Sequence, residues 1–260
     1  MTDFKVITSK ENSLIKFISA LQTSAKKRQE NGCFVLEGLR ICSDAKDNGI
    51  RFDKLIISES AALKYQNDII EFAEISGECF KLPDGLFKKI SDTTSPQGII
   101  AIAKIPEKSS SLIDRKGRYI ALENLADPSN LGAVARTAEA LGVSGIILSG
   151  DGCDPYSPKT LRASMGTLLR LPVFILDDFA TEIKNTGLKT YSCVVDKSAK
   201  PINSIDFDDG CALIIGNEAN GITEATKDIS DCLITIPMRG KAESLNAAVA
   251  ASIAMWEMMK

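Results

Sequence analysis

The chain has 260 residues, 44% of them hydrophobic and 25% charged, and its formal net charge is −3. This length accommodates one large domain or two ordinary ones with a sizeable core, and the weak negative charge argues against a protein that holds nucleic acid by bulk positive charge. The sequence contains no histidine, which excludes Ser-His-Asp and Cys-His nucleophile relays and histidine-ligated zinc or iron. We expect no metal site.

Residues 1–105 predict an α/β unit in which helices and strands alternate. Asn12 can cap a first helix over roughly Ser13–Glu30, which ends in the basic cluster Lys26, Lys27 and Arg28. This cluster is either a solvated helix end favoured by the helix dipole or a set of phosphate contacts of an RNA-docking domain. Further helices are expected at residues 39–48, 61–75 and 86–90, and strands at residues 33–38, 54–58, 78–82 and 98–105.

Residues 106–117 are rich in proline, serine and charge and lack hydrophobic periodicity, which indicates a linker. In the second domain, residues 118–260, near-continuous apolar strands alternate with helices, a pattern typical of a parallel sheet covered on both faces. Ligands of such sheets bind at the carboxyl ends of the strands, so functional residues are expected in the loops that follow them. The strands are expected at residues 118–124, 145–149, 171–176, 190–195, 211–216 and 232–237.

The loop after the first of these strands leads into a helix that contains Asn130 and Arg136. Asn130 is either a helix N-cap or a polar residue of a site. Arg136 is either a solvated helix residue or a functional one. Because its sequence neighbours at 133–135 and 138 are small and apolar, we expect a partly buried guanidinium that needs a phosphate or carboxylate partner.

A second loop, Ile214–Ile222, runs from a buried strand directly into Gly216 and Glu218. Gly216 is expected to let a ligand approach the backbone closely, and Glu218 places an acid at the edge of an apolar sheet. The alternative is a tight turn followed by a helix cap.

A third loop ends in Ser244, which is expected to open a helix over Leu245–Met259. Ser244 could be a simple N-cap, but Asn246 would then lie inside a helix that is apolar on nearly every face, and a buried amide needs partners. Such a helix must be covered all round, by its own sheet and by a partner subunit.

Together the three loops resemble the three motifs of the SpoU (TrmH-like) RNA 2′-O-ribose methyltransferases of the SPOUT superfamily. The matching segments are D-P-x-N-L-G-A-x-x-R-T-A-x-A-L-G, I-I-G-N-E-x-x-G-I and I-P-M-x-G-x-x-x-S-L-N-x-A-x-A, in the family's order. The resemblance covers about residues 118–259, and residues 157–173 resemble the family's element between the first two motifs. Residues 1–105 are similar to the family's substrate-binding domain, which is itself similar to kink-turn-binding ribosomal proteins.

This resemblance implies an α/β fold in which the C-terminal parallel-sheet domain is threaded into a trefoil knot, and it implies a homodimer with sites near the interface. It also implies S-adenosylmethionine as methyl donor, held in the knot largely by backbone groups. The residues implicated in catalysis or in shaping the site are Asn130, Arg136, Glu218, Ser244 and Asn246. The donor-binding positions fall on Val194, Val195, Asp196, Lys197, Gly216, Asn217, Glu218, Ile236, Met238, Ser244 and Leu245.

We therefore expect an RNA 2′-O-ribose methyltransferase, with 23S ribosomal RNA as substrate and tRNA as the alternative. In this family the arginine that matches Arg136 is proposed to act as a base. We expect Arg136 instead to bind RNA phosphate and to stabilise the negative charge that develops on the ribose oxygen. A non-catalytic RNA-binding or ribosome-assembly factor is the alternative from another class, and the complete motifs argue against it. A nucleotide-dependent oxidoreductase is disfavoured because the dinucleotide fingerprint is missing.

The sequence also predicts a cytoplasmic protein without a membrane partner. Its N-terminus has no apolar signal segment, and no apolar stretch is long enough to span a membrane without polar interruption. Its seven cysteines form no C-x-x-C pair, and we expect buried free thiols in a reducing compartment.

Overall fold

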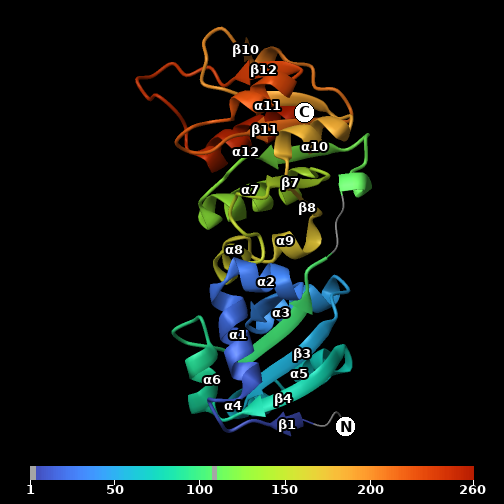
Figure 1. The fold of residues 1–260 in the computed structure, drawn as a ribbon, viewed down its shortest axis with the longest axis vertical. Helices are drawn as coiled ribbons and strands as arrows, with labels where there is room; N and C mark the ends of the chain where they lie inside the picture. The colour runs from blue at the N-terminus through green and yellow to red at the C-terminus, as the bar shows by residue number, and fades with distance from the viewer. Residues whose placement is uncertain (1–3, 107–109) are drawn as a thin grey trace. The chain divides into compact units, whose positions relative to one another are not determined.

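A computed structural model describes residues 4–106 and 110–260. The chain divides into two compact units (Figure 1). The first consists of Met1–Pro106 together with Tyr156–Leu169, and the second of Glu107–Pro155 together with Arg170–Lys260. The first unit is therefore assembled from two separate stretches of sequence.

The first unit is built on a mixed five-stranded sheet in the order β1-β4-β3-β5-β2. Strands β1, β4 and β3 are parallel, whereas β5 runs antiparallel to both β3 and β2. The strands are β1 (Phe4–Val6), β2 (Cys33–Glu37), β3 (Phe52–Ser58), β4 (Ser76–Leu82) and β5 (Ile99–Lys104). The helices from residues 4–106 are α1 (Ser13–Thr23), α2 (Ala25–Asn31), α3 (Leu39–Asp47), α4 (Glu59–Lys64), α5 (Gln66–Glu74) and α6 (Asp84–Ile90).

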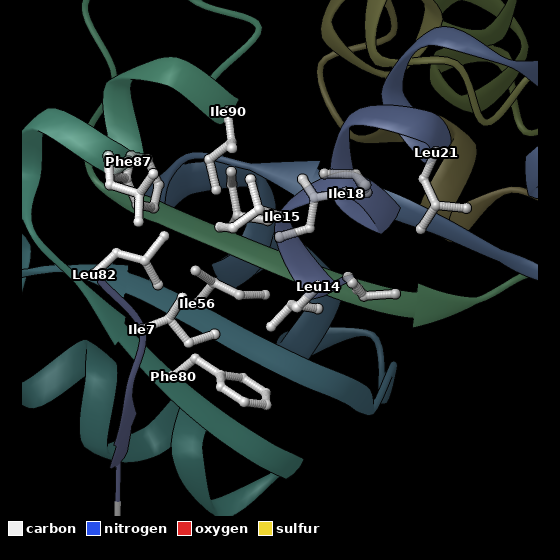
Figure 2. Packing of buried hydrophobic residues seen from close by; sticks show 14 of the residues in the cluster. Ile7, Leu14, Ile15, Ile18, Leu21, Ile56, Phe80, Leu82, Phe87 and Ile90 are labelled. Atoms are coloured by element: carbon white, nitrogen blue, oxygen red, sulfur yellow. The ribbon is translucent and has the colours of Figure 1, made fainter. Parts of the chain in front are cut away.

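A continuous hydrophobic core joins one face of this sheet to α1 and α6 (Figure 2). Helix α1 supplies Leu14, Ile15, Ile18 and Leu21, at the spacing that places apolar residues on one side of a helix. Each of these side chains is buried against the strands or α6. This core packs α1 and α6 against the sheet of the first unit.

The first predicted helix is in fact two helices, because the chain breaks at Ser24. Ser24 has an extended backbone, and its hydroxyl accepts a hydrogen bond from the Lys27 N–H at 3.2 Å, which caps α2. The break turns Arg28 inward, where its side chain is 4% exposed. Its guanidinium donates to the carbonyl oxygens of Leu21 and Gln22 at the end of α1, groups that a helix end leaves without partners. Arg28 is therefore a structural residue, and its predicted phosphate contact is wrong.

The segment Tyr156–Leu169 belongs with the first unit, although the sequence predicted it within the second domain. The Tyr156 ring lies 5.0 Å from that of Phe34 in β2, and α8 (Pro158–Ala163) packs on the same strand. Arg162 of α8 also pairs with Asp92, at 2.6 Å between Nη1 and Oδ2. Strand β2 is at the edge of the sheet and has no neighbouring strand on its outer side. The segment packs against this edge strand and so shields it. A short helix, α9 (Thr167–Arg170), ends the segment.

The second unit contains a fully parallel seven-stranded sheet in the order β10-β12-β9-β11-β6-β7-β8. The chain runs outward from β6 through β7 to β8 and then crosses to β9, and β11 is inserted between β9 and β6. The strands are β6 (Arg118–Leu122), β7 (Gly145–Ser149), β8 (Val173–Leu176), β9 (Lys189–Cys193), β10 (Lys200–Pro201), β11 (Cys211–Ile215) and β12 (Cys232–Thr235).

Two pairs of helices pack with this sheet: α10 with α11, and α7 with α12. They are α7 (Pro128–Leu141), α10 (Phe179–Asn185), α11 (Glu224–Ile229) and α12 (Ala247–Met258). Within the described residues, no helix is long and apolar enough to cross a membrane. All seven cysteines are free thiols, as the sequence predicted, but only Cys33, Cys42, Cys79 and Cys211 are buried; the other three are partly exposed.

Candidate functional site

A pocket of about 490 Å³ opens in the second unit, where the loops after β9, β11 and β12 meet the start of α12. Its volume falls within the range of roughly 300–1,000 Å³ that is usual for cofactor sites. Its walls combine apolar side chains with backbone groups of the three loops. The lining residues are Cys193–Asp196, Ile215–Ile222, Lys227, Leu233, Thr235, Ile236, Met238, Ser244, Leu245, Ala247 and Ala250.

The structure gathers almost all of the predicted donor-binding residues around this one pocket. Lys197 is the exception: it is exposed and does not line it. The residues that do are Val194, Val195, Asp196, Gly216, Asn217, Glu218, Ile236, Met238, Ser244 and Leu245. Lys227 also lines the pocket and is the cation among the lining residues, but the sequence did not predict it. Nothing in the sequence marks this lysine as a binding residue except its place on the helix after the second motif.

The wall formed by residues 216–222 is a tight turn that the chain closes on itself. The backbone N–H of Asn217 donates to the carbonyl oxygen of Gly221 at 3.0 Å, and the Gly221 N–H donates back to Asn217 at 2.9 Å. A Cβ atom at Gly216 would lie 2.1 Å from the carbonyl carbon of Gly221. Glycine is therefore required at 216 by the chain's own backbone, whereas the sequence suggested a close approach of ligand.

Three side chains, one from each motif, form a continuous hydrogen-bonded row. The Asn130 Nδ2 atom donates to Glu218 Oε1 at 2.8 Å, and Asn130 Oδ1 accepts from Asn246 Nδ2 at 3.1 Å. Asn130 is 9% exposed and lies inside α7, whose N-cap is Asp127 rather than Asn130. The row ends at Glu218, which also lines the pocket, and so connects the pocket to the first and third motifs.

The Glu218 carboxylate is held in its ionised form. Partial burial by itself raises the pKa of this carboxyl, but hydrogen bonds from Asn130 and from the backbone of residues 126, 127 and 218 outweigh it and lower the pKa below the ordinary value. By contrast, burial raises the pKa of the nearby Cys193 thiol to about 11. At neutral pH the pocket therefore holds a negative charge at Glu218, and Cys193 contributes a neutral wall.

Asn246 proves to be the N-cap of α12, which begins at Ala247 rather than at Leu245. Its Oδ1 atom accepts from the backbone N–H groups of Ala248 and Val249, at 2.9 and 3.3 Å. The expectation of a buried amide inside the helix is therefore wrong. Asn246 uses one end of its amide to start α12 and the other to bind Asn130. Ser244 is exposed in the preceding loop and lines the pocket.

Arg136 lies on the outer face of α7 and is exposed, so the predicted partial burial is wrong. Its sequence neighbours Val134 and Ala135 are buried, but they point to another side of the helix. Across residues 4–106 and 110–260, Arg136 appears in none of the identified hydrogen bonds or ion pairs. Its guanidinium is therefore available to a group from outside the chain.

Lys26 and Lys27 belong to the first unit and take no part in the pocket. Both ammonium groups are near Glu30, at 3.9 and 2.7 Å, on a well-exposed face of α2. Exposed pairs of this kind contribute little to stability, so both lysines can exchange Glu30 for another anion. The metal-ligating residue types among the described residues form no group of three or more suited to hold an ion.

Comparison with known proteins identifies both units. The profile of the SpoU rRNA Methylase family matches residues 117–256, and that of the MRM3-like substrate binding domain matches residues 12–101. A 23S rRNA (guanosine(2553)-2′-O)-methyltransferase, RlmP of Bacillus subtilis, is 31% identical over 98% of this chain and 99% of its own length. A 23S rRNA (uridine(2479)-2′-O)-methyltransferase of Streptomyces viridochromogenes is 27% identical over 98% of this chain and 91% of its own.

Solved structures agree with this assignment. An AdoMet-bound rRNA methyltransferase from Sinorhizobium meliloti superimposes with a TM-score of 0.86 at 29% identity, covering 98% of this chain and 97% of the other. The SpoU methyltransferase AviRb from Streptomyces viridochromogenes, in complex with AdoMet, gives 0.83 at 25% identity, covering 96% and 97%.

The fold and pocket thus define an α/β methyltransferase of the SPOUT class with an N-terminal domain, and the predicted fold class is confirmed. Within that class, the chain belongs to the SpoU rRNA methylase family. The trefoil knot of the second unit and the similarity of the first unit to kink-turn-binding ribosomal proteins stay predictions.

Proposed function

We propose that this protein transfers a methyl group from S-adenosylmethionine to a ribose 2′-hydroxyl of RNA, and that its substrate is 23S ribosomal RNA. The row Asn246–Asn130–Glu218 carries the proposal, because it joins three separate motifs at the rim of one cofactor-sized pocket. The two relatives named above act on 23S rRNA and match this chain along nearly its whole length.

The pocket suits the donor chemically. Ile215, Leu233, Ile236, Met238 and Leu245 provide apolar surface for a purine ring, and the loop backbones provide hydrogen-bonding groups. Glu218 and Asp196 supply carboxylates for a molecule that carries a sulfonium and an ammonium group. When bound, S-adenosylmethionine supplies a methyl group already activated by its positive sulfur.

The chain's own residues then have to bring the ribose into line with that methyl group. Glu218 fixes the orientation of the Asn130 amide, and Asn130 fixes that of Asn246. We assign these amides and Ser244 to orienting the ribose and the guanidinium that binds it. Arg136 presents a planar fork suited to RNA phosphate and to the negative charge that develops on the ribose oxygen.

A homodimer is part of the proposal. Helix α12 exposes Val249, Ile253 and Trp256 at intervals of three or four residues, which places them on one face, and Leu245 is exposed in the loop just before the helix. The neighbouring helix α7 packs alongside, with Thr137 Oγ1 3.2 Å from Ser252 Oγ. A second copy of the chain covering this face would bury its apolar surface beside Arg136.

The first unit is proposed to dock RNA, with Lys26 and Lys27 as phosphate contacts and without Arg28, which is buried. Residues 1–105 then act as the RNA-binding domain, residues 106–117 as the linker and residues 118–260 as the methyltransferase domain, except that Tyr156–Leu169 is structurally part of the first unit. We place the protein in the cytoplasm, where ribosomal RNA is found.

Transfer of a radiolabelled methyl group from S-adenosylmethionine to purified 23S rRNA, with tRNA compared in parallel, tests the proposal. Digestion to nucleosides identifies the 2′-O-methylated product. Asn130→Ala should lower transfer strongly, while Asn203→Ala, at an exposed position in the same unit, should leave it unchanged. Labelling of tRNA alone would favour the tRNA alternative, and binding of RNA without any transfer would favour a non-catalytic factor.

A further inference from the structure

One carboxylate in the second unit is buried and is not part of the pocket or of the hydrogen-bonded row. Glu123 follows directly after β6 and is 3% exposed. Its Oε1 atom accepts hydrogen bonds from the hydroxyls of Thr223 and Thr226, both at 2.7 Å, and its Oε2 atom accepts from the Thr223 backbone N–H at 2.9 Å. No ion pair of Glu123 was found within the described part of the chain, so these three bonds are what compensates the burial of its charge.

The bonds of Glu123 hold both ends of the pocket wall. Its backbone N–H donates to the carbonyl oxygen of Ile215 at 2.9 Å, immediately before the wall begins. Its side chain binds Thr223, immediately after the wall ends. Every residue between these two points, 216–222, lines the pocket. A single residue at the end of β6, ahead of the first motif, therefore fixes the start and the end of a loop that belongs to the second motif.

Movement at one end of this loop must be transmitted along it. At its neck, Gly216 packs so closely on Gly221 and Ile222 that a methyl group does not fit between them. Thr223 is also the N-cap of α11, the helix that carries the lining residue Lys227. Freeing Thr223 from Glu123 would therefore release the loop's exit and the first turn of α11 together.

We propose that Glu123 is a positioning residue for the methyl-donor pocket, acting through Thr223 and Thr226 on the loop 216–222. The inference rests on the proposed function, because it takes that pocket as the site of S-adenosylmethionine. Glu123 does not touch the donor, since it does not line the pocket. What it contributes is hydrogen-bond acceptors at fixed positions.

Glutamine and alanine at position 123 separate this role from a chemical one. In Glu123→Gln the amide oxygen can accept from the Thr223 N–H, and the amide nitrogen can donate to the threonine hydroxyls, which also accept. We expect calorimetric affinity for S-adenosylmethionine to stay within about threefold of wild type in Glu123→Gln and to fall by roughly tenfold or more in Glu123→Ala, because three donors, among them the buried Thr226 hydroxyl, lose their acceptor. The KM for the donor should rise accordingly, and kcat at saturating donor should change little.

Asp231 and Thr190 offer a matched control. Asp231 Oδ2 accepts from the backbone N–H and the hydroxyl of Thr190, at 2.8 and 2.9 Å, the same type of clamp. This pair lies at the amino ends of β9 and β12, whereas the pocket lies at their carboxyl ends. Asp231→Ala should therefore lower thermal stability without changing donor affinity. Should Glu123→Ala fail to fold, Thr226→Val, which removes one of the three bonds, should still weaken donor binding severalfold.

Three results would overturn the inference and leave the proposed function standing. Wild-type donor affinity in Glu123→Ala would show that the clamp does not set the pocket. Equal weakening in Asp231→Ala would reduce the effect to general loss of stability. Loss of methyl transfer in Glu123→Gln with unchanged donor affinity would give the carboxylate a chemical role instead. Failure of the wild-type protein itself to bind S-adenosylmethionine would refute the proposed function, and the inference with it.

Discussion

Replacement of Arg136 by alanine separates catalysis from stability. The guanidinium is exposed on α7 and takes part in no hydrogen bond or ion pair identified within residues 4–106 and 110–260. The substitution therefore removes no identified contact within the subunit, and alanine is the slightly better helix former. The free energy of unfolding should change by no more than about 0.5 kcal/mol.

Activity should respond differently. If Arg136 binds RNA phosphate and the charge that develops on the ribose oxygen, its loss should slow methyl transfer by about a hundredfold or more, which corresponds to about 2.7 kcal/mol of transition-state stabilisation. Arg136→Lys should recover little of this rate, because an ammonium group cannot reproduce the planar, bidentate fork. The affinity for S-adenosylmethionine should be unchanged, since Arg136 does not line the donor pocket.

The assay is single-turnover methyl transfer to 23S rRNA at saturating donor. It is accompanied by calorimetric titration of the donor, chemical denaturation and sedimentation of each variant. Transfer by Arg136→Ala within a few-fold of wild type would refute the catalytic assignment. A loss of several kcal/mol in stability would instead reveal a buried ion pair, contrary to the exposed position of the side chain.

Two other surfaces yield predictions of the same kind. Trp256, 58% exposed on α12, should anchor the dimer, so Trp256→Glu should give a monomer by sedimentation at micromolar concentration, while Leu63→Glu on the first unit should not; a wild-type monomer would contradict the proposed interface. Joint replacement of Lys26 and Lys27 by alanine should flatten the dependence of RNA affinity on salt by one to two counterions, whereas Arg28→Ala should lower thermal stability and leave that slope alone. An unchanged slope in the lysine variant would make the two residues a solvated helix end.

The sequence located the strands well because their boundaries have local causes. The strand expected at 145–149 is β7 at Gly145–Ser149, and the one expected at 211–216 is β11 at Cys211–Ile215. Apolar runs bounded by glycine or polar residues determine such elements almost alone. The three motif loops were likewise placed together at one sheet edge, because parallel strands present their carboxyl ends on the same side.

Side-chain environments depended on contacts that the sequence does not show. Arg136 was expected to be partly buried because of its sequence neighbours, but on a helix the residues three and four positions away share its face, and Ala133 and Ala140 are exposed. Ser24 can lie within a helix or cap one, and only the packing of α1 and α2 decides between them. The role of Asn246 likewise depends on where α12 begins. The sequence allowed Ser244 to open this helix, which would put Asn246 inside it, but the helix begins three residues later, at Ala247, and Asn246 caps it.

The first unit is assembled from two separate stretches of sequence, and this has a consequence for biosynthesis. The strands of its sheet have all been translated by Pro106, but Tyr156–Leu169, which covers β2, has not. The ribosome must add the 63 residues from 107 to 169 before this segment is complete. At roughly 5–20 residues per second, a ribosome needs about 3 to 13 s to make that stretch. During this interval β2 emerges as an uncovered edge strand, the kind of surface that recruits other strands. The nascent polypeptide therefore passes through a period of vulnerability that ends only when β7 and its following helix have left the exit tunnel.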